Sequence, residues 1–351
     1  MKICVTGGSG FIGSNLIHQL VKQKHQVLNL DIETSAAHPF SLKKLKSSSL
    51  FTHKRVDISQ QQAILPLLDS FQPEAVIHLA SENQQQQLAK DASQYLVPNT
   101  LGTAKLLEAV SAYWSQLPKQ RQLDFRFLHS STAAVFYNLQ NPRYRISESD
   151  PQQPSNLYCL SKASANNLVQ LWQQDLGLPT LITYASETYG PRQLPHHFIP
   201  NRLIQALKQQ PLKVTDESYY QQDWLYVDDH VEAIIQVLMR GQPGESYLIS
   251  AELEVTALEL LRQLCHLLDA LRPQKTSYLN LVCYQDSGLT YNTSYQFDAS
   301  KLRKQLGWQP QETLTSGLTK TLNWYLDNPD WVSWWLDQQQ QPRKRRVIQG
   351  I

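Results

Sequence analysis

The stretch "KICVTGGSGFIGSNL", residues 2–16, decides the fold because a strand pattern runs through a glycine-rich turn into a helix pattern. Its apolar and β-branched start is typical of a buried strand, and the apolar spacing of residues 11–23 is typical of a helix. Gly7 allows a tight turn, Gly10 allows backbone to approach a pyrophosphate, and Gly13 allows the helix to pack on the strand. The helix N-terminus adds N–H groups and the positive end of the helix dipole. The sequence therefore predicts a turn that binds an anion.

Strand patterns continue to alternate with helix patterns along the chain. Further strands are expected over residues 25–31, 75–81, 125–131 and 178–186, and helices over 11–23, 99–115 and 154–177. This alternation predicts parallel strands joined by right-handed crossovers, hence an α/β fold with a doubly wound parallel sheet of the Rossmann type. After about residue 190 the alternation ends, and helices near 196–208 and 256–272 indicate a smaller C-terminal lobe that holds the substrate.

We expect three parts in the chain. They are a Rossmann domain over 1–189 with its sheet completed by about 225–250, an interleaved substrate lobe over 190–330, and a tryptophan-rich helix end with a basic tail over 331–351. The tail is interpreted as a solvated end, and contact with an acidic partner is the alternative.

Composition excludes several classes of protein. The 351 residues carry 32 basic and 30 acidic side chains, so no overall charge favours nucleic acid as a partner. No stretch approaches the ~18 apolar residues of a membrane span. Four scattered cysteines without a C-x-x-C pair are typical of free thiols in a reducing compartment. The sequence predicts a cytoplasmic protein without a metal site.

Asp31 indicates which dinucleotide the glycine turn binds. It ends the second predicted strand, about 18 residues after Gly13. A carboxylate there accepts from the adenosine ribose hydroxyls and repels a 2′-phosphate, so we expect NAD rather than NADP.

Tyr158 and Lys162 are candidate catalytic residues because they share one face of the predicted helix. A nearby ammonium is expected to lower the pKa of the Tyr158 phenol. A phenolate takes a proton from an alcohol while hydride passes to a nicotinamide.

Further stretches resemble one family. In order they are "RVDI" (55–58), "HLAS" (78–81), "NTLGT" (99–103), "YGPR" (189–192) and "DWLYVDDH" (223–230). With the glycine turn, Tyr158 and Lys162, they resemble the extended short-chain dehydrogenases/reductases, the NAD-dependent epimerases and dehydratases. Within that family the chain is most similar to dTDP-glucose 4,6-dehydratases.

The resemblance implies roles for further residues. Asp57 and Ile58 would hold adenine, and Thr132 would donate a hydrogen bond to the reacting oxygen. The other residues implied to bind NAD are Phe11, Ile12, Leu79, Ala80, Asn99 and Ser130. The family also implies a nucleotide sugar as partner and a homodimer through a helix pair containing residues 99–115 and 158–175.

The stretch "HSSTAAVFY", residues 129–137, departs from the dehydratase pattern Ser-Thr-Asp-Glu-Val-Tyr-Gly. The family's Asp protonates the leaving hydroxyl and its Glu removes a proton from carbon, but Ala133 and Ala134 stand here. Each such group typically contributes ~10²- to 10⁴-fold, so we expect little elimination. Tyr137 also adds bulk where the family has glycine.

Other departures fall on the substrate side. They are Gln222 for an arginine, Glu187 and Thr188 for two asparagines, the run Asn83–Gln87, and the segment 287–295 without a basic residue. Glutamine does not neutralise phosphate, and Glu187 would repel it. His196 and His197 are candidates to replace the lost acid or base.

Three interpretations remain. The protein is an NAD-dependent nucleotide-sugar oxidoreductase or epimerase, or a 4,6-dehydratase proper, or a catalytically silent NAD-binding partner or sensor. We favour a nucleotide-sugar modifying protein of the epimerase/dehydratase family whose elimination activity is impaired or replaced.

Overall fold

The structure, a computed structural model, describes residues 1–34, 37–83, 91–137, 145–215, 218, 220–285 and 295–340. The glutamine run Gln84–Gln87, most of the segment 287–295 and the basic tail lie outside the described residues.

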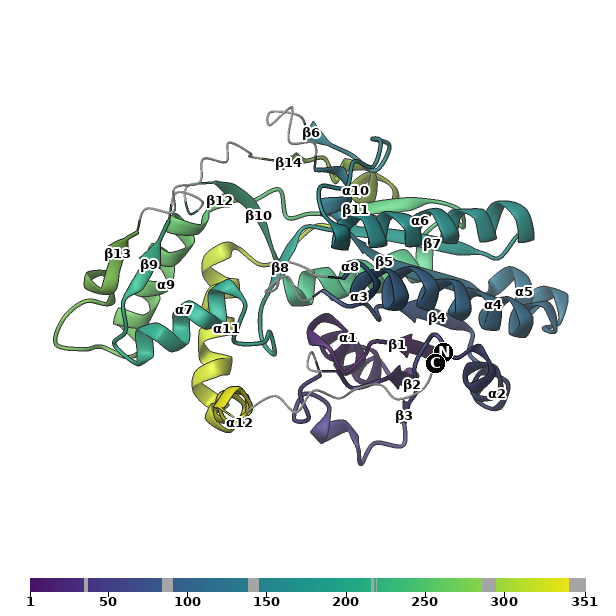
Figure 1. Cartoon of the computed structure of the whole chain (residues 1–351), viewed down its shortest axis with the longest axis horizontal. Coiled ribbons are helices and arrows are strands. Elements are labelled where there is room, and N and C mark those ends of the chain that lie inside the picture. The colour runs from purple at the N-terminus through teal and green to yellow at the C-terminus, as the bar shows by residue number, and fades with distance from the viewer. Residues whose placement is uncertain are drawn as a thin grey trace.

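A seven-stranded parallel sheet forms the centre of the larger part (Figure 1). Its strands, in spatial order, are β11 (Ser246–Ile249), β7 (Thr180–Ala185), β5 (Arg126–Thr132), β4 (Ala75–His78), β1 (Lys2–Thr6), β2 (Gln26–Asp31) and β3 (Phe51–Arg55). The chain turns back at β1, the order typical of a doubly wound sheet. The predicted fold class is therefore confirmed. Strand β3 was not predicted, because "FTHKR" has only one buried residue.

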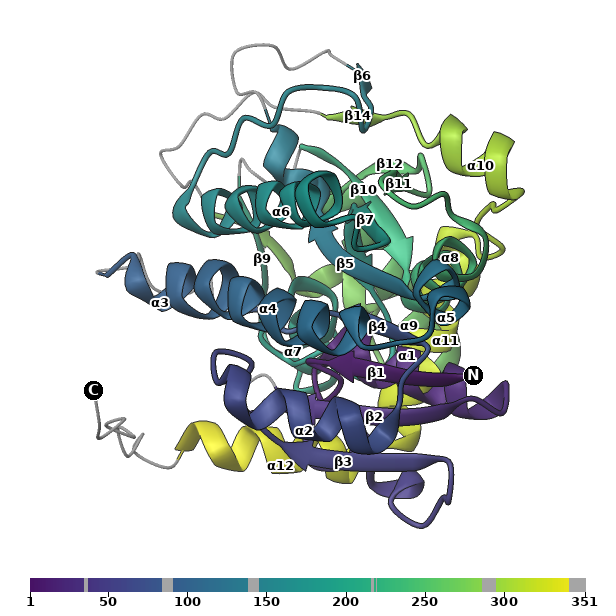
Figure 2. The same cartoon turned by 90° about the vertical axis from the view of Figure 1, so that its right-hand side faces the viewer.

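Helices cover both faces of this sheet, and each face has its own apolar core. On one face lie α1 (Phe11–Lys22), α8 (Val227–Arg240) and α10 (Ser300–Leu306). On the other lie α2 (Gln61–Phe71), α4 (Gly102–Ser115) and α6 (Leu157–Leu176), with the short α3 (Ser93–Tyr95) and α5 (Lys119–Asp124) nearby. Figure 2 shows α4 and α6 side by side along the outer side of the second face.

A smaller lobe packs around a third apolar core beyond the carboxyl ends of the strands (Figure 1). Its helices are α7 (Phe198–Leu207), α9 (Ala257–Leu271), α11 (Leu314–Asp327) and α12 (Pro329–Gln340). Its short strands are β8 (Glu187–Tyr189), β9 (Leu212–Val214), β10 (Gln221–Tyr226), β12 (Glu254–Thr256) and β13 (Val282–Tyr284), and β6 (Arg145–Ile146) pairs with β14 (Gln296–Phe297). The helices expected near 196–208 and 256–272 are confirmed, whereas the domain boundaries stay a prediction.

The helix predicted over residues 99–115 begins differently in the structure. A π-helical turn spans Leu96–Leu101, and α4 starts at Gly102. Within this turn the Asn99 amide accepts from the Glu82 backbone N–H at 2.7 Å and donates to Ser161 Oγ at 2.9 Å. A π-turn inserts one extra residue, which aims a side chain away from the regular helix face.

The tryptophan-rich helix α12 packs against the segment that follows β2. His38 Nε2 donates to the Trp331 carbonyl oxygen at 3.0 Å, and the two rings stack with their centroids 4.0 Å apart. His38 Nδ1 accepts from the Phe40 N–H at 3.3 Å, so the neutral ring uses both nitrogens. Burial lowers the pKa of His38 to about 4. The contact ties the C-terminal helix to the cofactor side of the protein.

Within the part of the chain that the structure describes, the helices do not combine the length and the hydropathy of a membrane span. All four cysteines are free, and three of them are buried.

His38 gives the protein a defined acid sensitivity. Its folded pKa lies below the ordinary value, so the unfolded chain binds more protons as the pH falls from 6.5 towards 4. We expect the free energy of unfolding to fall with pH over this range, and a His38→Asn variant to show a shallower slope. Urea unfolding between pH 5 and 7 measures both. The exposed His266→Asn variant is the control, and an unchanged slope in His38→Asn would contradict the expectation.

Candidate active site

The glycine turn after β1 is shaped by contacts that exclude side chains. Gly7 has φ of +73°, and a Cβ there would lie 2.5 Å from the Ala80 backbone nitrogen. A Cβ at Gly13 would lie 2.4 Å from the Gly7 carbonyl oxygen. Gly10 is the N-cap of α1, where no side chain caps the helix. The turn therefore leaves the first N–H groups of α1 open to an anion.

Two side chains of β2 hold this turn. Asn29 Oδ1 accepts from the Gly8 N–H at 3.1 Å. Asp31 Oδ2 accepts from the Ser9 N–H at 2.9 Å, and its Oδ1 accepts from the Glu33 N–H at 2.6 Å. Each carboxylate oxygen has a second lone pair, so the same carboxylate can also accept from ribose hydroxyls. Asp31 is fixed in orientation before any ligand arrives.

The other residues expected at the cofactor follow the carboxyl ends of neighbouring strands. Phe11 and Ile12 begin α1, Asp57 and Ile58 follow β3, and Leu79 and Ala80 follow β4. The Leu79 N–H donates to the Thr6 carbonyl oxygen at 3.0 Å, which continues the sheet contact past β4. Carboxyl ends of parallel strands meet at one edge, where doubly wound sheets bind ligands. The residues present fit a dinucleotide along this edge.

Thr132 ends β5 and begins the turn that lacks ionisable groups. Its Oγ1 accepts from the Ala134 N–H at 3.2 Å, which starts a 3₁₀ turn over Ala133–Phe136. Ala133 is fully buried in the apolar core, and Val135 and Phe136 are buried with it. The turn presents the Thr132 hydroxyl but no acid or base.

Tyr158 lies in the first turn of α6, and Lys162 lies one turn later. Asn156 caps the helix through its Oδ1, which accepts from the Cys159 N–H at 2.9 Å. Lys162 Nζ donates to the Ser130 carbonyl oxygen at 2.8 Å and so joins α6 to β5. Ser130 and Lys162 are therefore in contact beside the end of β5, and the Tyr158 ring, one turn earlier on α6, lies 6.2 Å from the Tyr95 ring between centroids.

The predicted lowering of the Tyr158 pKa is wrong for this structure. Burial raises the pKa of Tyr158, and the Cys159 and Glu187 side chains add to the effect. Burial also lowers the pKa of Lys162 to about 7. The helix N-terminus favours a phenolate by only ~0.3–1 kcal/mol, so the loss of water around the ring outweighs it. Sequence spacing shows that two groups share a face, but it does not show how much water reaches them.

Two buried histidines lie near Lys162. His78 shares hydrogen bonds with Thr6 Oγ1 at 2.7 Å and Thr103 Oγ1 at 2.9 Å, and its ring centroid is 5.0 Å from that of His129. Burial lowers the pKa of both rings, and the charge of Lys162 lowers them further. Both are neutral at pH 7, and no described carboxylate pairs with Lys162.

The structure does not support His196 and His197 as replacement acids or bases. Their rings pack on each other, with centroids 4.3 Å apart, and the His196 ring centroid is 6.2 Å from that of Trp335 on α12. Burial lowers the pKa of His197 to about 4.

Glu187, which the sequence indicates only as a residue that would repel phosphate, lies near the predicted catalytic residues. It begins β8, two residues after Ala185, which pairs with Thr132 in the sheet. Part of the residue is accessible to solvent, but the surrounding protein raises the pKa of its carboxyl group to about 7. Its charge raises the pKa of Tyr158 and of Tyr137, so all three groups lie near one another. The position directly after a buried strand was the available signal.

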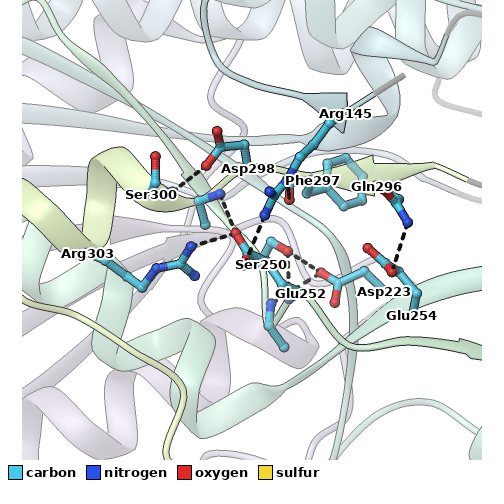
Figure 3. A network of polar contacts seen from close by, with 12 residues as sticks. Arg145, Asp223, Ser250, Glu252, Glu254, Gln296, Phe297, Asp298, Ser300 and Arg303 are labelled. Atoms are coloured by element: carbon cyan, nitrogen blue, oxygen red, sulfur yellow. Dashed lines mark hydrogen bonds and ion pairs between the residues drawn. The ribbon is translucent and has the colours of Figure 1, made fainter. Parts of the chain in front are cut away.

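Tyr137 lies on the substrate side, where its ring stacks on Tyr295 with centroids 4.1 Å apart and an angle of 3° between the planes. Figure 3 shows a nearby network in which Glu252 lies between Arg145 and Arg303. Glu252 Oε2 is 3.3 Å from Arg145 Nη2, and Glu252 Oε1 is 2.8 Å from Arg303 Nη2. These two arginines are therefore already neutralised by a carboxylate.

Comparison with known proteins agrees with this architecture. The family model described as GDP-mannose 4,6 dehydratase matches residues 4–321. The chain is 38% identical over 332 residues to the dTDP-glucose 4,6-dehydratase of Neisseria gonorrhoeae, covering 93% of this chain and 96% of that protein. It is 36% identical over 341 residues to dTDP-glucose 4,6-dehydratase 1 of Escherichia coli K12, covering 95% of this chain and 94% of that protein.

Solved structures show the same fold. The dTDP-glucose 4,6-dehydratase of Bacillus anthracis in complex with NAD superposes with a TM-score of 0.83 at 28% identity, covering 95% of this chain and 99% of that chain. The UDP-glucuronic acid 4-epimerase of Bacillus cereus, in complex with UDP-glucuronic acid and NAD, gives a TM-score of 0.78 at 24% identity. The match covers 93% of this chain and 99% of that chain. The second likeness concerns the fold alone.

The glycine turn gives a direct test of cofactor binding. A Gly13→Ala variant places a methyl group 2.4 Å from the Gly7 carbonyl oxygen, so α1 must shift away from β1. We expect its affinity for NAD, the cofactor predicted from the sequence, to fall at least ~10-fold, equal to about 1.4 kcal/mol. Calorimetric titration measures the change.

The matched control is Gly177→Ala. Gly177 has φ of +72° at the end of α6, and nothing lies within 4 Å of an added Cβ. This variant should lose about 1 kcal/mol of stability and bind NAD normally. Equal affinities in both variants would count against the glycine turn as the pyrophosphate site.

Proposed function

We propose that this chain is an NAD-dependent enzyme that oxidises and reduces a hydroxyl-bearing carbon of a nucleotide sugar. The chain belongs to the GDP-mannose 4,6 dehydratase family. One observation carries this proposal. Thr132 ends β5, Lys162 of α6 bonds to Ser130 of the same strand, and Tyr158 lies one turn before Lys162, whereas the turn Ala133–Phe136 carries no ionisable side chain. Hydride transfer needs Thr132, Tyr158 and Lys162, and elimination needs an acid and a base that this turn lacks.

The chain's own residues have separable tasks in such a reaction. The α1 N-terminus and the glycine turn bind the pyrophosphate, and Asp31 binds the adenosine ribose. Bound NAD would supply the hydride acceptor. Thr132 Oγ1 and the Tyr158 hydroxyl would bind the carbinol oxygen, with Tyr158 accepting its proton as the carbonyl forms. Lys162, whose Nζ donates to the Ser130 carbonyl oxygen, would stabilise a phenolate at Tyr158 when it is protonated.

Burial favours the neutral forms of both Lys162 and Tyr158 before ligands bind. The pKa of Lys162 is lowered to about 7, so its ammonium is only partly populated near neutral pH, and burial keeps Tyr158 protonated. A substrate hydroxyl or a cofactor charge that favours the phenolate would offset the effect of burial on Tyr158.

Hydride transfer without elimination is the expected outcome with nucleotide sugars. NAD-saturated protein is incubated with dTDP-glucose, UDP-glucose and UDP-glucuronic acid, and reduced nicotinamide and sugar products are measured. We expect hydride transfer or epimerisation with a member of this panel and no 4-keto-6-deoxy product from dTDP-glucose. A Tyr158→Phe variant should be slower by ~10²- to 10⁴-fold.

The control for this experiment is Tyr284→Phe, since Tyr284 lies exposed on β13. Rapid formation of the 4-keto-6-deoxy product would contradict the proposal in favour of a dehydratase proper. NAD binding with no hydride transfer across the panel would instead favour a catalytically silent NAD-binding protein.

A homodimer through the α4–α6 side of the molecule is part of the proposal. Four apolar side chains of this side are 43–48% exposed, namely Val97, Leu101, Leu160 and Leu171. Leu160 and Leu171 lie eleven residues apart on α6, so they share one helix face. The π-turn that carries Val97 and Leu101 packs beside α6 (Figure 2). In a symmetric dimer, the same helix pair of a second copy of this chain would cover these apolar side chains.

Charge on this face should separate the two copies. We expect a Leu160→Asp variant to shift the mass measured by sedimentation equilibrium towards one chain. Leu207→Asp, at a 39% exposed position on α7, should leave the mass unchanged. A wild-type protein that sediments as a single chain would contradict the dimer.

A further inference from the structure

Local strand geometry directs Glu187 towards the catalytic side of the sheet. In β8, Thr188 turns towards α8, where its Oγ1 lies 2.9 Å from His230 Nδ1. Successive side chains of a strand point to opposite faces, so Glu187 points to the face that carries α6. Tyr158 lies on that helix, and Tyr137 follows β5 on the same face.

Glu187 differs from the other acids nearby because its carboxyl group has no partner. It is exposed, and its side chain forms no hydrogen bond or ion pair with any described residue. In contrast, Asp223 accepts from Ser250 Oγ at 2.6 Å and from the Leu253 N–H at 2.7 Å (Figure 3). Glu252 is likewise occupied by Arg145 and Arg303. Only Glu187, of these three acids, is free to act on a ligand.

The electrostatic setting suits proton transfer near neutral pH. Although Glu187 is exposed, the protein around it raises the pKa of its carboxyl group to about 7, and the titratable groups that respond to its charge are Tyr137 and Tyr158. A carboxylate of raised pKa is a stronger base than an ordinary one. No described lysine or arginine forms an ion pair with it that would weaken this basicity.

We propose that Glu187 is a catalytic residue of this site. Its carboxylate removes a proton from the carbon next to the carbonyl carbon of the sugar, and its carboxyl group returns a proton to that carbon. This rests on the proposed function for the binding of a nucleotide sugar, but not on the hydride step itself. Because Tyr158 binds the oxygen of the reacting carbon, a carboxylate beside Tyr158 lies near that neighbouring carbon.

The proton transfer balances within the chain's own groups. The C–H bond breaks, its proton moves to the Glu187 carboxylate, and its electron pair forms an enolate on the carbonyl oxygen. Thr132 and Tyr158 stabilise this oxygen through their hydroxyl groups. The enolate then takes a proton from Glu187, and the carbonyl returns. The step needs no oxidant. Because the only carboxyl group acts as the base, no second one protonates a leaving group, and none is expelled.

Deuterium exchange tests the step separately from hydride transfer. NAD-saturated protein is placed in D₂O with dTDP-4-keto-6-deoxyglucose, which already carries the ketone, and deuterium at the two flanking carbons is followed by NMR. We expect exchange at least ~10²-fold faster than in buffer, and a Glu187→Gln variant close to the buffer rate. Glu232→Gln on α8, on the opposite face of the sheet, is the matched control and should exchange like the wild type.

The pH profile distinguishes catalysis from a structural role. After subtraction of the buffer rate, the exchange rate should rise with pH through about 7 and then level off, because the base must be deprotonated. Calorimetry in the same buffer measures binding of the keto sugar, which should persist in Glu187→Gln. Exchange at the buffer rate by wild-type protein, or equal rates in wild type and Glu187→Gln, would overturn the inference.

The two proposals fail in different ways. Exchange without any hydride transfer in the nucleotide-sugar panel leaves Glu187 as the base and refutes the oxidoreductase. Hydride transfer without exchange refutes the role of Glu187 alone. Lack of binding of the keto sugar together with no hydride transfer across the panel refutes both.

Discussion

The close approach of α1 to the end of β1 is the constraint on which the site depends. A side chain at Gly13 would meet the Gly7 carbonyl oxygen at 2.4 Å, so the helix reaches this position only without one. The approach fixes where the N-terminus of α1 points and allows Asn29 and Asp31 to bond to the turn. Ala80 of the neighbouring β4 end closes against the same turn at Gly7. One backbone contact therefore aligns three strand ends along the ligand edge.

The two halves of the site differ in how their charges are compensated. On the cofactor side, Asp31 accepts two backbone N–H groups, and the helix dipole faces the ligand. Around the reacting centre, the buried Lys162 and the exposed Glu187 each lack a countercharge among the described residues, and the protein around them moves the pKa of both to about 7. The pKa values of such groups change strongly when a ligand binds, because the ligand brings charges and hydrogen bonds that the protein does not provide.

Much of this arrangement was predictable from the sequence, and the exceptions share a cause. Strands such as β1 and β7 are buried on both faces and so carry apolar runs, whereas β3 lies at the sheet edge and carries a polar one. The glycine turn, Asp31 and the Tyr158–Lys162 pair follow from local spacing. The π-turn at Asn99, the protonation of Tyr158 and the place of Glu187 depend on contacts between distant segments. Local patterns carry no information about those contacts or about the water that they exclude.

The buried turn over Ala133–Phe136 has a consequence for substitution at position 133. Ala133 is enclosed by the apolar core, and the bulky Tyr137 stacks on Tyr295 directly after the turn. A carboxylate introduced at 133 would enter a space fitted to a methyl group, at a desolvation cost of several kcal/mol. A carboxylate at 133 would therefore lower the stability of the fold unless the neighbouring side chains also changed. Packing around Ala133, and not only the type of residue there, opposes an acid at this position.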